Sequence, residues 1–368
     1  MSLKKYIKIL FSLDFFPLKK SNILFLDTKF DNHKKKISFL KDRETIDIRL
    51  NKINLHVLIR LIFSNKKINF FNYIIEYLNI SKCKLLITFN DNLSWLYKIK
   101  IFMPSLKLIS IQNGLRSKFF FDQLKKNKLL SCDYIFTFNE SYAKQYKQNI
   151  STKTHCIGSF LNNSKKINKK KYKQKIILFV ASGWQEEGFQ DHIPCEKLHK
   201  EDTLLVKNLY RYCKLNNYKF AISSKLTKPG EYSFYKKILK TNDFSFFSPH
   251  TDNKNVYELS DRSLVTVSSH STVGFESLSR GNRTAMFNNK DNYKYFFDFF
   301  WYLKLNKSGI FWSHKCNFNE VSRILNFAVN SNEKTWKKKT DKFLKKFMYF
   351  DKNNKTLLKK LSVISKNI

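Results

Sequence analysis

A hydroxyl-rich turn after a short apolar run is the part of the sequence best suited to bind a charged ligand. The run covers 264–267, and it is followed directly by Ser268, Ser269, His270, Ser271 and Thr272. If the run is a strand and a helix begins at Ser271 or Thr272, the N–H groups of the first helical turn and the hydroxyls together suit a phosphate. Serine and threonine are also ordinary helix caps, so the same pattern fits a capped helix that binds nothing.

Gly274, Glu276 and His270 extend this candidate phosphate site. Gly274 lacks a side chain and would let a ligand approach the backbone. Glu276 lies about one helical turn beyond the start, where its carboxylate can accept hydrogen bonds from ribose hydroxyls. His270 could serve as an acid or as a phosphate ligand, and it could equally be an ordinary loop histidine. The segment therefore predicts a site for the phosphate and ribose of a nucleotide.

The elements that position this turn follow from the spacing of apolar residues. Short apolar runs alternate with longer helical patterns, which is typical of parallel sheets built from strand–helix–strand units. The expected strands are 22–26, 84–89, 107–111, 134–138, 175–181, 219–223, 244–247, 264–267 and 284–287. The expected helices are 55–63, 69–78, 92–102, 118–130, 203–215, 232–239, 255–260, 272–280, 320–329 and 335–360. In such sheets ligands bind beyond the carboxyl ends of the strands, which is where the serine turn falls.

The strands and helices form two series, separated by a lysine-rich stretch. Residues 162–174 contain six lysines and little apolar content, which is typical of an exposed linker. The sequence therefore predicts an α/β fold with two Rossmann-like, doubly wound domains facing a cleft. The first domain is expected at 1–165 and the second at 175–330, with a helical segment at 331–368 packing back.

The last helical segment carries an apolar face with two alternative uses. Its apolar positions are Phe343, Leu344, Phe347, Met348, Leu357, Leu358 and Leu361. The face can pack on a domain, or it can rest on an anionic membrane as part of a basic amphipathic helix.

Four segments carry a resemblance to a known family. They are Ile111-Gln112-Asn113-Gly114, Cys132-Asp133-Tyr134-Ile135-Phe136, Ile157-Gly158-Ser159-Phe160-Leu161-Asn162-Asn163 and Ser271-Thr272-Val273-Gly274-Phe275-Glu276. In order and spacing, the chain resembles the bacterial surface carbohydrate biosynthesis protein family. These are GT-B-type glycosyltransferases related to capsule and lipopolysaccharide transferases.

This resemblance implies a nucleotide-activated sugar in the C-terminal domain and an acceptor, a glycan or its lipid-linked precursor, in the N-terminal domain. It places Gln112, Asn113 and Gly114 on the acceptor side. Related transferases often carry Gln-His-Gly here, so Asn113 replaces a histidine that could act as a base. No cofactor is implied, because the nucleotide-sugar is a substrate.

The loop after the strand at 175–181 could complete the donor site. Ser182 and Gly183 would offer backbone amides to a phosphate. Glu186 or Glu187 could act as the general base that deprotonates the acceptor hydroxyl. The alternative is a pair of solvated glutamates on a surface loop.

Two further loops supply charged or titratable side chains. Lys225 follows the strand at 219–223 and could neutralise the leaving phosphate, although a chain so rich in lysine places one in most loops. His250 lies in the loop that often contacts the donor base in GT-B enzymes. No Asp-x-Asp motif and no metal-ligand spacing occurs, so no metal is expected. The absence of G-x-G-x-x-G and of a P-loop motif argues against a dehydrogenase or a P-loop ATPase.

The composition gives a formal net charge of +40, from 69 basic and 29 acidic residues. Abundant Lys, Asn, Ile and Phe with few Gly and Pro fit an A/T-rich gene, and a polyanionic neighbour fits the same charge. Lysines occur in nearly every segment and no nucleic-acid module is visible, which argues against nucleic acid as the partner. No run of 18 apolar residues and no leader is visible, and the six cysteines lack C-x-x-C spacing. These features favour a cytoplasmic location, or peripheral contact with anionic lipid at the inner face of the cytoplasmic membrane.

Three functions remain at this point. The first is a metal-independent glycosyltransferase that uses a nucleotide-sugar donor, with a CMP-linked sugar as one option, in lipopolysaccharide, O-antigen or capsule synthesis. The second is a CDP-polyol phosphotransferase of the teichoic-acid type. The third, from another class, is a non-catalytic protein that binds a polyanion or nucleic acid.

Overall fold

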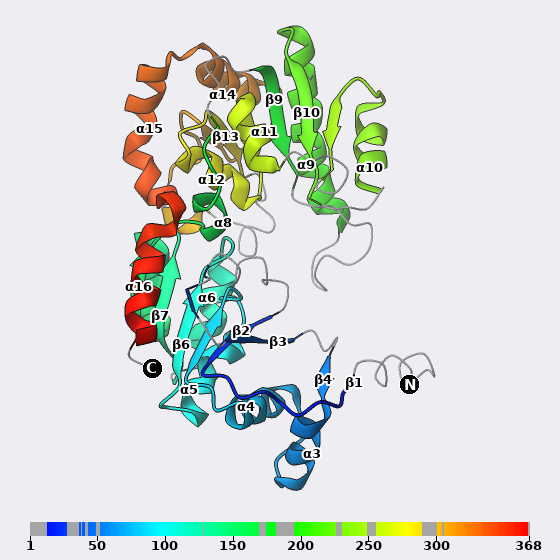
Figure 1. The fold of residues 1–368 in the computed structure, drawn as a ribbon. Coiled ribbons are helices and arrows are strands. Elements are labelled where there is room, and N and C mark those ends of the chain that lie inside the picture. Colours follow the sequence, from blue (N-terminus) through cyan, green and yellow to red (C-terminus); the bar gives the residue numbers. More distant parts are fainter. Residues whose placement is uncertain are drawn as a thin grey trace. The chain divides into compact units, whose positions relative to one another are not determined.

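The computed structural model describes two compact units, each built on a six-stranded parallel sheet (Figure 1). The residues described are 13–27, 37, 39–40, 43–48, 52–127, 129–168, 174–181, 195–225, 230–248, 255–288, 300–303 and 305–366. The first unit comprises 1–113, 120–161 and 351–368, and the second comprises 114–119 and 162–350. The predicted α/β class with two Rossmann-like units is confirmed.

The sheet of the first unit has the strand order β3-β2-β5-β6-β7-β8. Its strands are β2 (Ile23–Leu26), β3 (Arg43–Ile46), β5 (Leu85–Thr88), β6 (Lys107–Ile111), β7 (Ser131–Thr137) and β8 (Ser151–Cys156). Its helical segments are α3 (Leu55–Phe63), α4 (Phe70–Ile80), η2 (Ser94–Lys98), α5 (Ile99–Phe102), α6 (Lys118–Lys125), α7 (Glu140–Asn149), α8 (Phe160–Asn163) and α16 (Lys355–Lys366), of which α6 and α8 each straddle a boundary between the units. A separate parallel pair joins β1 (Leu13–Asp14) to β4 (Ile53–Asn54). The central strands are continuous apolar runs because helices cover both faces of a parallel sheet.

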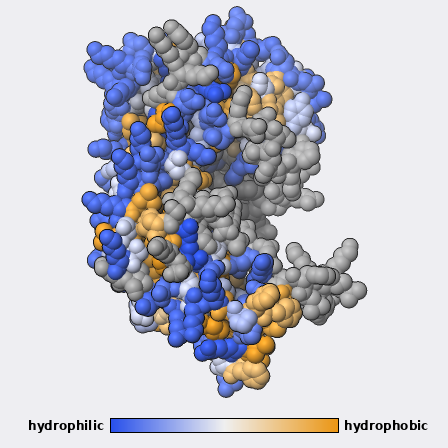
Figure 2. Space-filling view, in the orientation of Figure 1, coloured by the Kyte–Doolittle hydropathy of each residue, from blue (hydrophilic) through white to orange (hydrophobic). Residues whose placement is uncertain are grey.

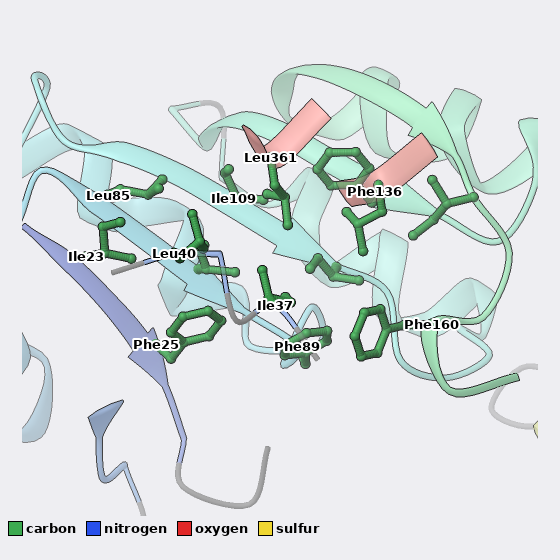
Figure 3. Close-up of a cluster of buried hydrophobic side chains, with 14 residues drawn as sticks. Ile23, Phe25, Ile37, Leu40, Leu85, Phe89, Ile109, Phe136, Phe160 and Leu361 are labelled. Carbon is green, nitrogen blue, oxygen red and sulfur yellow. The ribbon is translucent and has the colours of Figure 1, made fainter. Parts of the chain in front are cut away.

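The core of the first unit includes the C-terminal helix. In Figure 3, side chains from the strands, among them Ile109 and Phe136, lie in one cluster with Leu361 of α16. Leu357 belongs to the same cluster, and both leucines are almost fully buried. The apolar face of α16 is therefore used for packing.

The sheet of the second unit has the strand order β11-β10-β9-β12-β13-β14. Its strands are β9 (Gln174–Val180), β10 (Lys219–Ser223), β11 (Ser245–Phe247), β12 (Ser263–Ser268), β13 (Thr284–Phe287) and β14 (Trp312–Ser313). Its helical segments are α9 (Cys195–Leu215), α10 (Gly230–Leu239), α11 (Val256–Arg262), α12 (Thr272–Ser279), η4 (Trp301–Leu303), α14 (Phe318–Asn330) and α15 (Glu333–Phe347), with η5 (Lys352–Asn354) leading into α16.

Asparagine begins several of these helices. The side chains of Asn54, Asn69 and Asn139 accept hydrogen bonds from backbone N–H groups of the first turns of α3, α4 and α7. Asn317 and Asn332 do the same for α14 and α15. An asparagine-rich chain thus satisfies N–H groups that helix starts leave without backbone partners.

One prediction about the connecting segments is wrong, and another is wrong in part. The helix expected at 335–360 is two helices, because Met348 is extended and Asn353 has a φ of 60°. The chain passes from the second unit to the first between residues 350 and 351, so the seven apolar positions do not form one face. The expected exposed linker at 162–174 begins with Asn162 and Asn163, which are buried, whereas Lys166 and Asn168 are exposed and 169–173 lie outside the described residues.

Among the described residues, no helix has both the length and the apolar character that crossing a bilayer requires.

Candidate functional site

The second unit has a topological switch point between β9 and β12. From β9 the chain adds β10 and β11 on one side of the sheet, and it then adds β12, β13 and β14 on the other side. Connections that leave neighbouring strands in opposite directions open a crevice at the carboxyl ends of the strands, which is where ligands bind in such sheets. Val180, the last residue of β9, is in register with Ser268, the last residue of β12. The serine turn therefore begins at this crevice.

The four loops predicted to bind the donor follow β9, β10, β11 and β12. These strands are consecutive in the sheet, so the loops begin side by side at this edge. Ser223 and Phe247, which end β10 and β11, are in register with each other, and Ser223 is in register with Val180. Lys225 follows β10 and is exposed. Five predicted residues lie outside the described part of the chain: Ser182, Gly183, Glu186, Glu187 and His250. The roles of these five residues stay predictions.

The serine turn is braced by its own hydrogen bonds. Ser271 is the N-cap of α12, and its hydroxyl accepts from the N–H of Val273 at 3.3 Å. The Ser268 hydroxyl donates to the carbonyl oxygen of Ser271 at 3.2 Å. The four residues from His270 to Val273 are half-buried, so the first turn of the helix is accessible. The predicted helix start is confirmed, and its positive end lies at the switch point.

Gly274 has a packing role that the sequence did not indicate. A Cβ atom at this position would lie 2.6 Å from the Cβ of Ser268 and 2.9 Å from its hydroxyl oxygen. Only glycine therefore lets α12 come this close to β12. The expected use of Gly274, to admit a ligand to the backbone, stays a prediction.

Three buried carboxylates near this edge each accept a hydrogen bond from a hydroxyl. Glu276 accepts from the hydroxyl of Tyr257 at 3.1 Å. Asp202 accepts from Ser269 at 3.3 Å, and Glu231 accepts from Ser224 at 2.6 Å. Ser269 is therefore held by α9, and Glu276 is 4% exposed. Among the described residues, no three His, Cys, Asp or Glu side chains are grouped so as to hold a metal ion.

Arg280, one turn beyond the site, forms a fully buried ion pair with Asp261. Its Nε and Nη2 atoms donate to the two carboxylate oxygens at 2.9 and 2.5 Å. Burial on its own raises the pKa of Asp261, but hydrogen bonds from Arg280, Asn282 and the Asn168 N–H, with the Arg280 charge, outweigh burial and hold that pKa below its usual value.

The same guanidinium group holds the segment that enters the second unit. Its Nη1 donates to the side-chain oxygen of Asn162 at 3.1 Å, and its Nη2 donates to the carbonyl oxygen of Lys166 at 2.9 Å. Arg280 is thus a structural residue that fixes residues 162–168 against α11 and α12 (Figure 1).

The first unit has its own switch point, between β2 and β5. Asp27 follows β2 and Asn90 follows β5 by two residues, and the Asn90 amide donates to the Asp27 carboxylate at 2.8 Å. Asp27 has a φ of 79°, a conformation that is uncommon for any residue other than glycine. Sequence reasoning missed this pair, although both residues are polar and directly follow apolar runs.

The predicted acceptor-side residues lie one strand away, after β6. The Gln112 side chain is buried, and its oxygen accepts from the N–H of Phe138 at 2.9 Å, which fixes the end of β7. Asn113 is exposed, and its N–H donates to Asp91 at 3.1 Å. The chain enters the second unit at Gly114.

Asp91 is the anchor of that loop. Its second carboxylate oxygen accepts from the hydroxyl of Tyr146 at 2.5 Å, and its carbonyl oxygen accepts from the hydroxyl of Tyr97 at 2.7 Å. All three residues are fully buried. A buried carboxylate thus sets the position of Asn113 at the carboxyl edge of the sheet.

A cavity of about 430 Å³ lies in the second unit, away from the serine turn and the start of α12. Its lining includes Lys219 and Ser245, the first residues of β10 and β11. It therefore opens at the amino edge of the sheet, opposite the switch point.

Solved structures with the same arrangement define the class of fold. S. aureus MnaA, solved with UDP, is 12% identical, with a TM-score of 0.55 over 95% of this chain and 98% of that one. A variant of the wall teichoic acid polymerase TagF is 12% identical, with a TM-score of 0.53 over 96% and 90%. A glycosyltransferase from Rickettsia africae is 12% identical, with a TM-score of 0.52 over 95% and 98%. The chain therefore has a glycosyltransferase-like fold of the GT-B type.

The sequence also matches a protein family, which is more specific than the fold class. Residues 109–364 match the model of the family described as "putative O-antigen biosynthesis protein". The chain belongs to this O-antigen biosynthesis family, as the predicted resemblance to surface carbohydrate enzymes implied. A search of curated proteins finds no match.

Proposed function

We propose that this protein is a glycosyltransferase that moves a sugar from a nucleotide-activated donor to the precursor of a surface glycan. The observation that carries the proposal is the accessible start of α12 at the switch point between β9 and β12. A helix N-terminus in that position suits the phosphate that leaves the sugar. Membership of the O-antigen family supports a surface glycan as the product, in lipopolysaccharide or a related polymer.

The donor is assigned to the second unit. Ser271 and Thr272 would donate to the phosphate, and the positive end of α12 would stabilise the charge that develops as the glycosidic bond breaks. Lys225 would add a cation at the end of β10, on the other side of β9 from β12, so that no metal is needed. Glu276 is assigned to the ribose and His250 to the base. A monophosphate suits a single helix start, which favours a CMP-linked sugar.

The acceptor is assigned to the first unit. Gln112, Asn113 and Gly114 mark its loop, and Asp91 holds Asn113 in place. The acceptor hydroxyl must lose its proton as it attacks the sugar carbon, and Glu186, Glu187 or His270 are the candidates for the base. Asn113 cannot take that role because an amide does not titrate.

The likeness to TagF favours one alternative, a CDP-polyol phosphotransferase. The same helix start would then bind CDP, and a polyol phosphate would be transferred in place of a sugar. The two reactions differ in their products, because a polyol phosphodiester keeps phosphorus in the polymer and a glycoside does not.

A nucleotide panel tests the proposal. The purified full chain is heated with CMP, CDP, UDP and GDP in turn, and the midpoint of unfolding is recorded. A ligand at 100 times its Kd stabilises the folded chain by about 2.7 kcal/mol, so one nucleotide is expected to raise the midpoint by several degrees. The matching activated sugar, or CDP-glycerol, is then supplied with extracted lipid-linked glycan, and the product is analysed for sugar and phosphorus. No stabilisation by any nucleotide would count against both reactions.

A further inference from the structure

Helix α3 in the first unit carries large apolar side chains on its exposed side as well as on its buried side. Its sequence contains only two polar residues, His56 and Arg60. Val57 and Leu61 are buried against the unit, whereas Ile62 and Phe63 are 51% and 82% exposed. Large apolar side chains that gather on an exposed surface mark a site of contact with a partner or with lipid, and α3 has a core on one side only.

Other exposed apolar side chains lie beside α3. Phe15 and Phe16 follow β1, and their carbonyl oxygens accept from His56 at 3.0 Å and from Asn54 at 2.9 Å, at the start of α3. Ile68 is exposed in the connection from α3 to α4. Figure 2 shows orange side chains gathered over α3 and the β1–β4 pair, whose labels are in Figure 1. We call Phe15, Phe16, Ile59, Ile62, Phe63 and Ile68 the α3 patch.

Basic residues lie next to the α3 patch along the chain. Residues 52–76 contain Lys52, Arg60, Lys66 and Lys67 and a single carboxylate, Glu76. Glu76 is buried and contacts Arg60 at 2.8 Å and Lys66 at 3.5 Å. Lys52 and Lys67 are exposed, and Lys19 and Lys20, just after Phe16, are exposed as well. Carboxylates lie here too, because Lys19 pairs with Glu44 at 3.4 Å and Asp47 accepts from the N–H of Lys52, but the lysines and Arg60 outnumber them. An apolar surface with a basic border complements an anionic lipid surface.

We propose that the α3 patch docks the protein on the surface of an anionic bilayer. In this arrangement α3 lies in the interface with Ile62 and Phe63 among the acyl chains, and the lysines contact phosphate-bearing headgroups. A second copy of the chain is a poorer occupant, because two molecules that each carry a net charge of +40 repel one another. The apolar faces of α15 and α16, the other membrane candidates in the sequence, are used for internal packing through Phe347, Leu357 and Leu361.

Vesicle sedimentation tests the proposal with the purified full chain. The probes are vesicles of phosphatidylcholine mixed with phosphatidylglycerol and vesicles of phosphatidylcholine alone. The wild type is expected to sediment mainly with the mixed vesicles. Ile62→Ser with Phe63→Ser should weaken partitioning at least about tenfold, because two large apolar side chains no longer enter the bilayer. Val363→Ser is the matched control, since Val363 is an exposed apolar residue of α16, and it should change nothing.

A second pair of variants tests the charge. Lys52→Gln with Lys67→Gln should lower partitioning on mixed vesicles by about fivefold or more and leave the weak binding to neutral vesicles unchanged. All these side chains are exposed, so the unfolding midpoint serves as a check that the fold is intact. Equal binding by the wild type and the Ile62/Phe63 variant would overturn the proposal. A dimer in solution that the Ile62/Phe63 variant dissociates would also overturn it, because the patch would then be an interface between two copies.

Discussion

Replacing Arg280 by methionine is expected to destabilise the second unit by about 3–5 kcal/mol. The substitution keeps most of the apolar stem but leaves the Asp261 carboxylate buried without its cation, and that uncompensated charge is the main cost. The segment at 162–168 also loses the guanidinium that holds it. Denaturant unfolding followed by tryptophan fluorescence gives the change in the free energy of unfolding.

Arg323→Met is the matched control. Arg323 also pairs with a carboxylate, Glu320 at 2.9 Å, and donates to the carbonyl oxygen of Gly309 at 2.8 Å and to the hydroxyl of Ser308, but its side chain is 42% exposed. A solvated pair of this kind contributes about 1 kcal/mol or less. Equal effects of the two substitutions would contradict the structural role of Arg280.

The loss in the free energy of unfolding caused by Arg280→Met should also depend on pH. Asp261 has a lowered pKa when folded, so it stabilises the wild type above its unfolded pKa of about 3.9, and this contribution disappears as the pH falls through the folded value. In the variant, burial without the cation raises the pKa, and protonation then relieves the buried charge. The difference in stability between the two proteins should therefore begin to shrink above about pH 3.9, as the pH falls through the raised pKa of Asp261 in the variant, and it should go on shrinking until the pH passes the lowered pKa of Asp261 in the wild type. A constant difference from pH 7 to pH 3 would be the contrary result.

Asp91→Ala is expected to destabilise the first unit by about 2–4 kcal/mol. The substitution leaves the buried Tyr146 hydroxyl, and the N–H of the exposed Asn113, without the carboxylate that accepts from them. On the proposed function, the acceptor loop would also lose its anchor, so transfer activity should fall at temperatures where the fold is intact. Thermal unfolding and a transfer assay give the two quantities.

Tyr146→Phe separates the two effects of Asp91. It removes one hydrogen bond of the carboxylate but keeps the contact with the N–H of Asn113. It should cost about 1–2 kcal/mol and leave the transfer rate close to that of the wild type. If Tyr146→Phe lowers the rate as much as Asp91→Ala, the position of Asn113 is not what Asp91 controls.

The sequence predicted the central strands well, but of the four edge strands it predicted only β11 and missed β3, β8 and β14. The expected ranges 107–111, 219–223 and 284–287 agree with β6, β10 and β13, because a strand buried on both faces is a short apolar run with polar ends. The edge strands β3 and β8 have the sequences RETI and STKTHC. Each is bonded on one side only and carries polar residues, so no apolar run marked it.

In the candidate site, the sequence predicted features that depend on neighbouring residues, but not contacts between residues far apart in the chain. The helix start at Ser271 is a local signal, and the structure confirms it. The role of Arg280 depends on Asn162, which is 118 residues away, and the pair of Asp27 and Asn90 spans 63 residues. Spacing along one chain does not reveal such partners. The strand order, which places the switch points, depends on the tertiary structure in the same way.

The affinity of the start of α12 for a nucleotide tests the central claim most directly. Calorimetric titration of the nucleotide that stabilises the wild type is repeated with Ser271→Ala combined with Thr272→Ala. Asn332→Ala serves as the control, because it removes a helix cap of the same kind from α15. We predict a Kd at least about tenfold weaker for the serine–threonine variant and unchanged for the control, since hydrogen bonds to a charged group contribute about 1.5–3 kcal/mol each. An unchanged Kd in the serine–threonine variant would mean that the turn only caps the helix, and that the phosphate binds elsewhere.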